Sequence, residues 1–371
     1  MSRIKMAVVG VGTIGTAHAS CIYNGEIDGM ELCALCDSDK ERVAELREEF
    51  KGIPIYESYE ELLKSGVCDG VIVSTPHYLH PIISKLFLEN NCHVLCEKPI
   101  GVYTKGLCEL IEAERGSGKK FAVMLNQRTN KLFVKAKELI KNGEIGEITE
   151  SVWIITNWYR TQEYYDSSSW RGSWQGEGGG VLMNQAPHNL DLWQWLCGMP
   201  KRVMAHCYEG KHHTVEVEDE AVIYAEYENG ANGTFITSTG NKYGTNRLEI
   251  TGKRGKILLE KGTLTIENED GTQVICDEEY NGHKNILQNF ANAILYNEKL
   301  ISPAQDAINQ LKLCNASYLS SWKGEWVNLD FDSEEYLNFL KLKVEKSQVK
   351  GAKKSKNLFD KSYKERWGTK W

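Results

Sequence analysis

A run of small residues near the amino terminus has the spacing of a phosphate-binding turn. The apolar segment "KMAVV" ends at Gly10, and Gly12 and Gly15 complete the pattern G-x-G-x-x-G. In such a turn the first glycine permits a tight bend, the second lets the backbone approach a pyrophosphate, and the third lets the next helix pack closely on the strand. The helix amino terminus then offers N–H groups to the phosphates. Glycine-rich turns are common, so the motif alone is weak evidence.

An acidic residue at the expected distance strengthens this interpretation. Asp37 ends the second apolar segment, 22 residues after Gly15. A carboxylate there accepts hydrogen bonds from ribose hydroxyls and repels a 2′-phosphate, and Ser38 follows it rather than an arginine. We therefore predict a dinucleotide site that takes NAD. The alternative is a glycine turn at a helix start with an unrelated surface aspartate.

Three further clusters carry polar groups that could do chemistry. "STPHYLH" follows the strand-like "DGVIV", and "CEKP" follows "HVL", so both are expected at the carboxyl edge where such sheets bind ligands. Lys98 sits there at a strand end and is followed by proline, which is unusual for a surface lysine. In "GEGGGVLMNQAPHNLD", Asn184, His188 and Asp191 recur at helical spacing. One face of a single helix is predicted to present all three.

The elements that must position these residues fall into two groups. The first 125 residues alternate strand and helix, which predicts a doubly wound parallel sheet. From about Glu147 the strands lengthen and turn signals such as "ENGANG" separate them, which predicts a largely antiparallel open sheet. We therefore predict an α/β protein with an NAD-binding domain in residues 1–125, a second α/β domain in 126–345 for substrate binding and oligomerisation, and a basic tail in 346–371.

Composition excludes several classes of protein. The 371 residues are enough for two domains, and no apolar run approaches the ~20 residues of a membrane helix. Eleven cysteines in a chain without an export signal indicate reduced thiols and a cytoplasmic protein. Cys33 and Cys36 would point to opposite faces of a strand, so no metal site is expected. Residues 341–371 hold ten Lys and one Arg against three acids, but no nucleic-acid motif accompanies this charge.

Taken together, the motifs resemble those of the Gfo/Idh/MocA family of NAD(P)-dependent oxidoreductases. The glycine turn, Asp37, "TPHYLH", "EKP", "GEIGEI", "WRGSW", "NQAPHNLD", "VEVEDEA" and "NRLEITGKRGKI" spread over about residues 4 to 345. The resemblance implies an N-terminal Rossmann domain and a C-terminal open-sheet domain that commonly mediates oligomerisation. It also implies hydride transfer between nicotinamide C4 and a carbon of a sugar, polyol or related compound.

The family pattern also implies roles for individual residues. Lys98 matches the lysine near the nicotinamide and the substrate hydroxyl, and His188 matches the histidine that serves as acid/base or orients substrate. A neutral imidazole accepts a proton near neutral pH, and an ammonium stabilises a developing alkoxide. The residues expected to bind the cofactor are Gly10, Gly12, Thr13, Ile14, Gly15, Asp37, Ser74, Thr75, Pro76, His80, Glu97 and Lys98. Those expected to bind substrate are Asn184, Asp191, Arg171, Glu177, Trp174 and His283.

Two positions depart from the family pattern. Many members carry aspartate where this chain has Asn184, so the base must be His188 or Lys98. His77 replaces the usual asparagine near the nucleotide.

Aromatic residues between Trp153 and Trp174 suit the apolar faces of a pyranose or an aglycone, although at least half of them are expected to pack in the sheet or at a subunit interface.

The sequence leaves several functions open. The version of "GEGGGVLMNQAPHNLD" found here resembles the branch that oxidises C3 of glycosides and nucleotide sugars, so we expect a sugar or glycoside 3-dehydrogenase acting as a homo-oligomer on a small carbohydrate. An inositol or other polyol dehydrogenase is an alternative. A further alternative is an NAD-recycling glycosidase or lyase acting by 3-keto elimination, with His283 or Glu177 as the additional base. A non-catalytic NAD-binding regulator would be expected to lack Lys98 or His188, and both are present.

Overall fold

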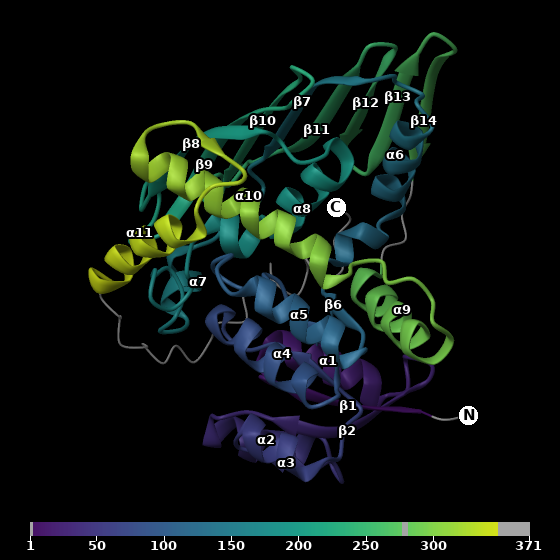
Figure 1. Ribbon diagram of the computed structural model, residues 1–371, viewed down its shortest axis with the longest axis vertical. Coiled ribbons are helices and arrows are strands. Elements are labelled where there is room, and N and C mark those ends of the chain that lie inside the picture. The colour runs from purple at the N-terminus through teal and green to yellow at the C-terminus, as the bar shows by residue number, and fades with distance from the viewer. Residues whose placement is uncertain (1–2, 277–280, 348–371) are drawn as a thin grey trace. The chain divides into compact units, whose positions relative to one another are not determined.

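The computed structural model describes residues 3–276 and 281–347, which form two compact units (Figure 1). The first comprises the described residues up to Thr129 together with Asn281–Ile308, and the second comprises the rest. All but two residues of the basic tail lie outside the described residues. Within the described ranges, no helix combines the length and the apolar character that crossing a membrane would require.

The described part of the first unit contains a parallel sheet with the strand order β3-β2-β1-β4-β5-β6. Its order reverses between β1 and β4, and ligands of such sheets bind at the carboxyl ends of the strands at this point. The predicted doubly wound sheet is thus confirmed. The strands are β1 (Ile4–Val9), β2 (Met30–Cys36), β3 (Ile55–Tyr56), β4 (Gly70–Val73), β5 (His93–Cys96) and β6 (Phe121–Val123).

Helices connect these strands, and polar side chains cap several of them. Asp39 accepts hydrogen bonds from the backbone N–H groups of Glu41 and Arg42 at the start of α2, and Ser58 caps α3. The elements are α1 (Thr13–Tyr23), α2 (Lys40–Glu49), α3 (Tyr59–Ser65), the 3₁₀ turn His77–Leu79, α4 (His80–Glu89), α5 (Leu107–Ser117), the 3₁₀ turn Asn126–Thr129 and α9 (Gly282–Tyr296).

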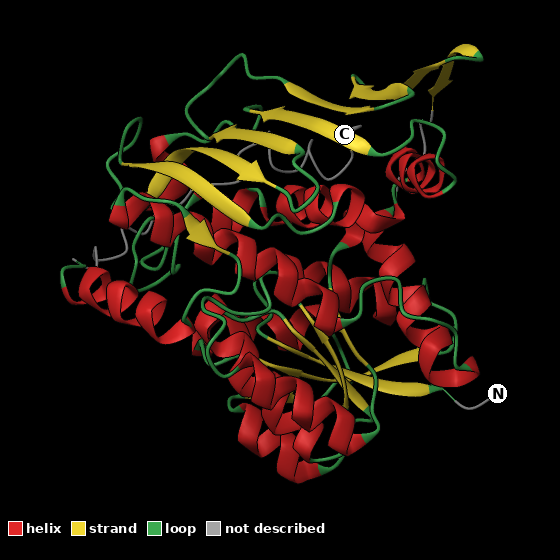
Figure 2. Cartoon of the chain, turned by 45° about the horizontal axis from the view of Figure 1, so that its top comes forward, coloured by secondary structure: helices red, strands yellow, loops and turns green. Residues whose placement is uncertain are grey.

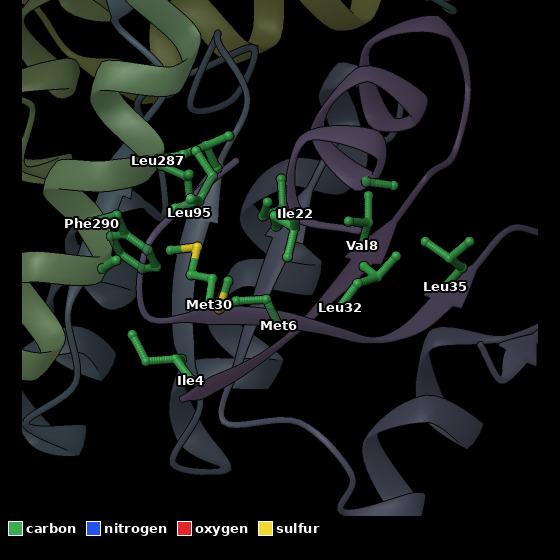
Figure 3. Close-up of a cluster of buried hydrophobic side chains, with 14 of the residues drawn as sticks. Ile4, Met6, Val8, Ile22, Met30, Leu32, Leu35, Leu95, Leu287 and Phe290 are labelled. Carbon is green, nitrogen blue, oxygen red and sulfur yellow. The ribbon is translucent and has the colours of Figure 1, made fainter. Parts of the chain in front are cut away.

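Helix α9 corrects the predicted domain boundary. We expected the second domain to continue from residue 126 to 345, but Asn281–Ile308 belongs to the first unit. The reason is hydrophobic, because Leu287 and Phe290 of α9 lie in one buried cluster with Ile4, Met6 and Met30 (Figure 3). A continuous domain was the simplest inference from sequence, and long-range burial overrides it.

The described part of the second unit contains a mixed sheet with the strand order β14-β13-β12-β11-β7-β10-β9-β8-β15. Strands β7 and β10 pair in parallel, and the other neighbouring strands pair antiparallel, so the predicted open, mostly antiparallel sheet is confirmed. The strands are β7 (Ile148–Ile155), β8 (Arg202–Glu209), β9 (Glu218–Glu226), β10 (Asn232–Ser238), β11 (Asn246–Gly252), β12 (Gly255–Glu260), β13 (Thr263–Asn268), β14 (Gly271–Cys276) and β15 (Val327–Asn328).

Helices pack on one face of this sheet. Figure 2 shows the helices in red and the strands in yellow. Burial alternates along β8 and β10, as expected for strands with one covered face. Trp193 of α8 stacks on Phe235 of β10 with ring centroids 5.4 Å apart, and the Ser320 hydroxyl of α10 accepts a hydrogen bond from the backbone N–H of Ala205 in β8. The helices of the second unit are α6 (Lys131–Lys141), α7 (Gln162–Asp166), the π-helical turn Val181–Gln185, α8 (Pro187–Cys197), α10 (Ala304–Lys323) and α11 (Ser333–Glu345). The residues of α10 up to Ile308 belong to the first unit.

The position of α9 in the first core gives a stability prediction. Phe290 is 0% exposed, whereas Tyr296 on the same helix is 69% exposed. We expect Phe290→Ala to lower the free energy of unfolding by about 3–5 kcal/mol, because it leaves a cavity in the core. The matched control Tyr296→Ala is expected to change it by less than about 0.5 kcal/mol. Denaturant unfolding measures both, and equal effects would contradict the assignment of α9 to this core.

Candidate active site

The glycine turn after β1 lies against the end of β4. Gly10 has a φ of +83°, and a Cβ atom there would lie 2.7 Å from the Ser74 carbonyl oxygen. A Cβ on Gly15 would lie 2.0 Å from the Gly10 carbonyl oxygen. The Ser74 hydroxyl donates to the same Gly10 oxygen at 2.7 Å. The protein's own packing therefore requires glycine at both positions, which accounts for the first and third glycines of the motif.

Gly12 is different, and its surroundings fit a nucleotide. A Cβ atom at this position would have no heavy atom within 4 Å, so nothing in the chain itself demands a glycine. Gly12 precedes α1, which opens with Thr13 and Ile14. A bare backbone facing open space at a helix amino terminus is what a pyrophosphate needs for close approach. Gly12, Thr13 and Ile14 are the residues that would hold it.

Asp37 is fixed beside this turn. One carboxylate oxygen accepts the Val11 backbone N–H at 2.8 Å, and the other accepts that of Asp39 at 3.0 Å. Each carboxylate oxygen accepts more than one hydrogen bond, so the group can still take ribose hydroxyls. Sequence analysis missed Arg42, whose guanidinium donates to the Val11 carbonyl at 2.9 Å and also pairs with Glu45.

The loops after β4 and β5 are joined by a buried histidine. One ring nitrogen of His80 lies 2.7 Å from the Pro99 carbonyl oxygen, and the other lies 2.7 Å from the Thr75 carbonyl oxygen. Burial lowers the pKa of His80 against these hydrogen bonds. His80 thus ties together the loop that contains Thr75 and Pro76 and the loop that follows Lys98. The His77 ring, which is also buried, lies 5.9 Å from the His80 ring.

Glu97 and Lys98 directly follow β5, in polar surroundings. The Glu97 carboxylate is 2.7 Å from Nε2 of His18 on α1, and its other oxygen accepts the Lys98 backbone N–H at 3.2 Å. Burial alone would raise the pKa of Glu97, but the His18 hydrogen bond and the nearby charges of His18, His283 and Lys98 lower it to about 2. Glu97 is therefore an ionised carboxylate buried beside a half-buried lysine.

The first unit brings His283 into the same cluster. Its ring centroid is 5.6 Å from that of His18, and the Asn126 side-chain amide lies 3.1 Å from its Nδ1. Burial lowers the pKa of His283 to about 4, against the attraction of Glu97, so the ring is neutral at neutral pH. Sequence analysis missed His18 and Asn126. A polar residue on the inward face of α1, three positions after Gly15, was a signal that could have found His18.

The second unit gathers three of the expected substrate residues. The Asn184 side-chain amide donates to the Glu177 carboxylate and, at 3.3 Å, to the Tyr164 phenol oxygen. Arg171 also donates to this phenol oxygen, as does Gln185 at 3.2 Å. Glu177 is buried and accepts the backbone N–H of Gly172 at 2.7 Å. Tyr164 is thus the centre of the cluster, although the sequence distinguished it only as one aromatic among several.

The expectation that a single helix presents Asn184, His188 and Asp191 is wrong. Asn184 belongs to the π-helical turn Val181–Gln185, and α8 begins at Pro187. His188 and Asp191 are both in α8, where His188 is half-exposed and Asp191 is buried and accepts a hydrogen bond from Gln194 at 3.1 Å. The turn interrupts the periodicity that the sequence suggested, so Asn184 is positioned separately.

A buried carboxylate positions the chain just before that turn. Glu218 accepts the backbone N–H groups of Gly180 and Leu182, each at 2.8 Å, and the Tyr318 hydroxyl at 2.7 Å. It thereby fixes the segment that leads into Asn184. Sequence analysis assigned no role to Glu218.

Trp174 has the surroundings of a core residue. It is 2% exposed, and its ring lies 5.4 Å from the rings of Tyr318 and Trp322. Its indole N–H donates to the Glu216 carbonyl oxygen at 2.9 Å. These contacts account for its burial without a ligand.

The expected catalytic residues lie on different units, Lys98 on the first and His188 on the second. Within the described ranges, no group of three or more His, Cys, Asp or Glu side chains is arranged to hold a metal ion.

The parallel sheet, the glycine turn and Asp37 define the class of NAD-binding oxidoreductases with a Rossmann domain.

Comparison with known proteins gives the family. Residues 4–125 match the model of an oxidoreductase family with an NAD-binding Rossmann fold, and residues 133–258 match the GFO/IDH/MocA C-terminal domain. The chain therefore belongs to the Gfo/Idh/MocA family of oxidoreductases.

Three relatives illustrate the range of the similarity. D-glucoside 3-dehydrogenase of Escherichia coli is 25% identical over 88% of this chain and 98% of its own length. Myo-inositol 2-dehydrogenase of Thermotoga maritima is 25% identical over 72% of this chain and 79% of its own length. The structure of the WlbA dehydrogenase from Bordetella pertussis, in complex with NADH and UDP-GlcNAcA, superposes with a TM-score of 0.80 at 25% identity, covering 89% of this chain and 100% of that one.

The open space at Gly12 gives a binding prediction. We expect Gly12→Ala to weaken NAD binding about tenfold or more, because a methyl group would occupy the approach of the pyrophosphate. The same change should cost no more than about 1 kcal/mol of stability. Calorimetric titration with NAD and thermal unfolding measure the two effects. The matched control is Gly116→Ala in α5, which also faces open space and should leave NAD affinity unchanged.

Proposed function

We propose that this oxidoreductase is an NAD-dependent sugar or glycoside 3-dehydrogenase, which oxidises the C3 hydroxyl carbon of a pyranose. The observation that carries the proposal is the position of Lys98 at the carboxyl end of β5, beside the ionised Glu97. The glycine turn follows β1 at the same edge of the parallel sheet. The proposal also places the protein in the cytoplasm and, through the open sheet of the second unit, in a homo-oligomer.

Lys98 and His188 handle the hydroxyl proton in this proposal. Oxidation of an alcohol removes the hydroxyl proton while the bound NAD accepts a hydride. A half-exposed imidazole such as His188 can accept a proton near neutral pH, and the Lys98 ammonium stabilises negative charge on the substrate oxygen. Asn184 cannot exchange a proton, so in this proposal it only forms a hydrogen bond with a substrate hydroxyl.

The substrate class is inferred from the second unit. Arg171, Glu177, Asn184 and Tyr164 form a hydrogen-bonded polar cluster, of the kind that recognises several hydroxyl groups of one ligand. Asp191 and His283 remain substrate-binding proposals, whereas the burial of Trp174 argues for a structural part. The names of the relatives support a sugar or cyclic polyol, and the name of the D-glucoside 3-dehydrogenase favours C3 of a pyranose. The UDP-GlcNAcA in the WlbA complex also supports a sugar ligand.

One assay tests this function directly. Purified protein with NAD is mixed with glucosides, free hexoses, inositols and nucleotide sugars, while NADH absorbance and product masses are recorded. A product two hydrogens lighter with stoichiometric NADH is expected from a pyranoside. Turnover of inositol alone would move the assignment to a polyol dehydrogenase. Release of aglycone without NADH would assign bond cleavage by 3-keto elimination, and no reaction with any compound would refute the proposal.

A lysine substitution tests the site. Lys98→Gln is expected to lower kcat by about 10²- to 10⁴-fold, because it removes the cation that stabilises the alkoxide. NAD affinity is expected to change little. Steady-state kinetics and NAD titration measure the two effects. Lys85→Gln is the matched control, since the side chain of this α4 lysine is 36% exposed and pairs with Glu89 and Glu109. Equal kinetics for the two variants would rule out a catalytic role for Lys98.

A further inference from the structure

His18, Glu97 and His283 form a buried cluster of titratable side chains next to Lys98. Glu97 and His18 are almost completely buried, and they come from different parts of the chain, since Glu97 directly follows β5 and His18 is in α1. Buried charges are costly unless they are paired and hydrogen-bonded. A buried and hydrogen-bonded carboxylate directly beside Lys98 therefore indicates a functional role.

We propose that Glu97, held by His18, is a positioning residue that holds the Lys98 backbone after β5 and keeps the Lys98 side chain protonated. This inference rests on the proposed function, because it gives Lys98 its part in that reaction. Nothing in the sequence motif assigns His18 to this task.

The hydrogen bonds of both Glu97 carboxylate oxygens support the proposal. One Glu97 oxygen is 2.7 Å from His18 Nε2, and the other accepts the Lys98 backbone N–H at 3.2 Å. An ionised carboxylate only accepts hydrogen bonds, so His18 must carry the proton on Nε2 and donate it. His18 therefore fixes the Glu97 side chain, which in turn holds the Lys98 backbone.

The charges around the carboxylate favour the ionised form. Titratable groups that interact electrostatically with Glu97 in the described part of the first unit include His18 of α1, His80 of α4, Cys96 of β5, Lys98, which follows β5, and His283 of α9. Burial lowers the pKa of His283 to about 4, so this ring is neutral at neutral pH, and burial also lowers the pKa of His80. The positive charge of Lys98 lowers the pKa of Glu97, and the same attraction favours the ammonium form of Lys98.

Loss of Glu97 should therefore make Lys98 easier to deprotonate. Trace labelling with acetic anhydride across a pH series, read by mass spectrometry of the Lys98 peptide, measures the midpoint at which the amine becomes reactive. In Glu97→Gln this midpoint is expected to fall by about one pH unit or more. Glu97→Asp keeps the negative charge, so its Lys98 midpoint is expected to lie close to that of the wild type. The peptide that contains Lys85 is the internal control in every sample.

His18 variants test the link through the histidine. His18→Leu removes the donor to Glu97 and should shift the Lys98 midpoint in the same direction, whereas His18→Gln keeps an N–H donor and should largely rescue it. The double variant His18→Leu/Glu97→Gln should shift it no further than Glu97→Gln alone, because both changes act through one carboxylate.

The outcomes separate this inference from the proposed function. An unchanged Lys98 midpoint in Glu97→Gln, with circular dichroism and thermal unfolding of a folded protein, would overturn the inference. Additive shifts in the double variant would overturn the route through His18. The labelling needs no substrate, so failure to reduce NAD with any sugar would refute the proposed function alone. Where the wild type is active, the pH profile of kcat should move with the labelling midpoint.

Discussion

The close contact between the glycine turn and the end of β4 is the constraint on which the nucleotide half of this protein depends. A methyl group on Gly10 or Gly15 would collide with backbone atoms, so the turn can approach Ser74 closely only with both glycines. This contact sets where α1 begins. It thereby places His18, three residues after Gly15, against Glu97 at the end of β5. Glu97 in turn accepts the backbone N–H of Lys98, so the glycine turn and the backbone at Lys98 are linked through His18 and Glu97.

Buried carboxylates organise loops in each of the two units. Glu97 holds the backbone at Lys98, and Glu218 holds the segment before Asn184. The buried carboxylate of Asp219 accepts the backbone N–H groups of Lys211, His212 and His213 at 2.7–3.0 Å. Each of these groups satisfies backbone donors that no strand or helix satisfies, so a loop of irregular conformation becomes well defined.

The second unit shows how a hydrogen-bonded cluster changes the interpretation of single residues. Arg171, Glu177 and Asn184 were distinguished by motif. In the structure Arg171 and Asn184 both donate to the Tyr164 phenol oxygen, and Asn184 also donates to Glu177. Trp174 lies in the same stretch of sequence, yet it packs in the aromatic core. Neighbouring positions in one motif therefore divide between polar recognition and packing, according to the direction in which each side chain points.

The sequence by itself determined the two sheets, the glycine turn, the acidic residue after β2 and the strand-end position of Lys98. These features depend on local periodicity, or on a fixed spacing between a strand and the helix that follows it. It also indicated NAD through Asp37, because that carboxylate acts at short range on the ribose.

The tertiary structure alone decided which distant segments share a core or a cluster. Helix α9 returns to the first unit because Leu287 and Phe290 bury their side chains there, and no local pattern records the partner of an apolar helix face. The π-helical turn that separates Asn184 from α8 interrupts a periodicity that the sequence appeared to continue. His18 joins Glu97 across 79 positions, since the pairing of two buried polar groups depends on three-dimensional packing rather than on spacing along the chain.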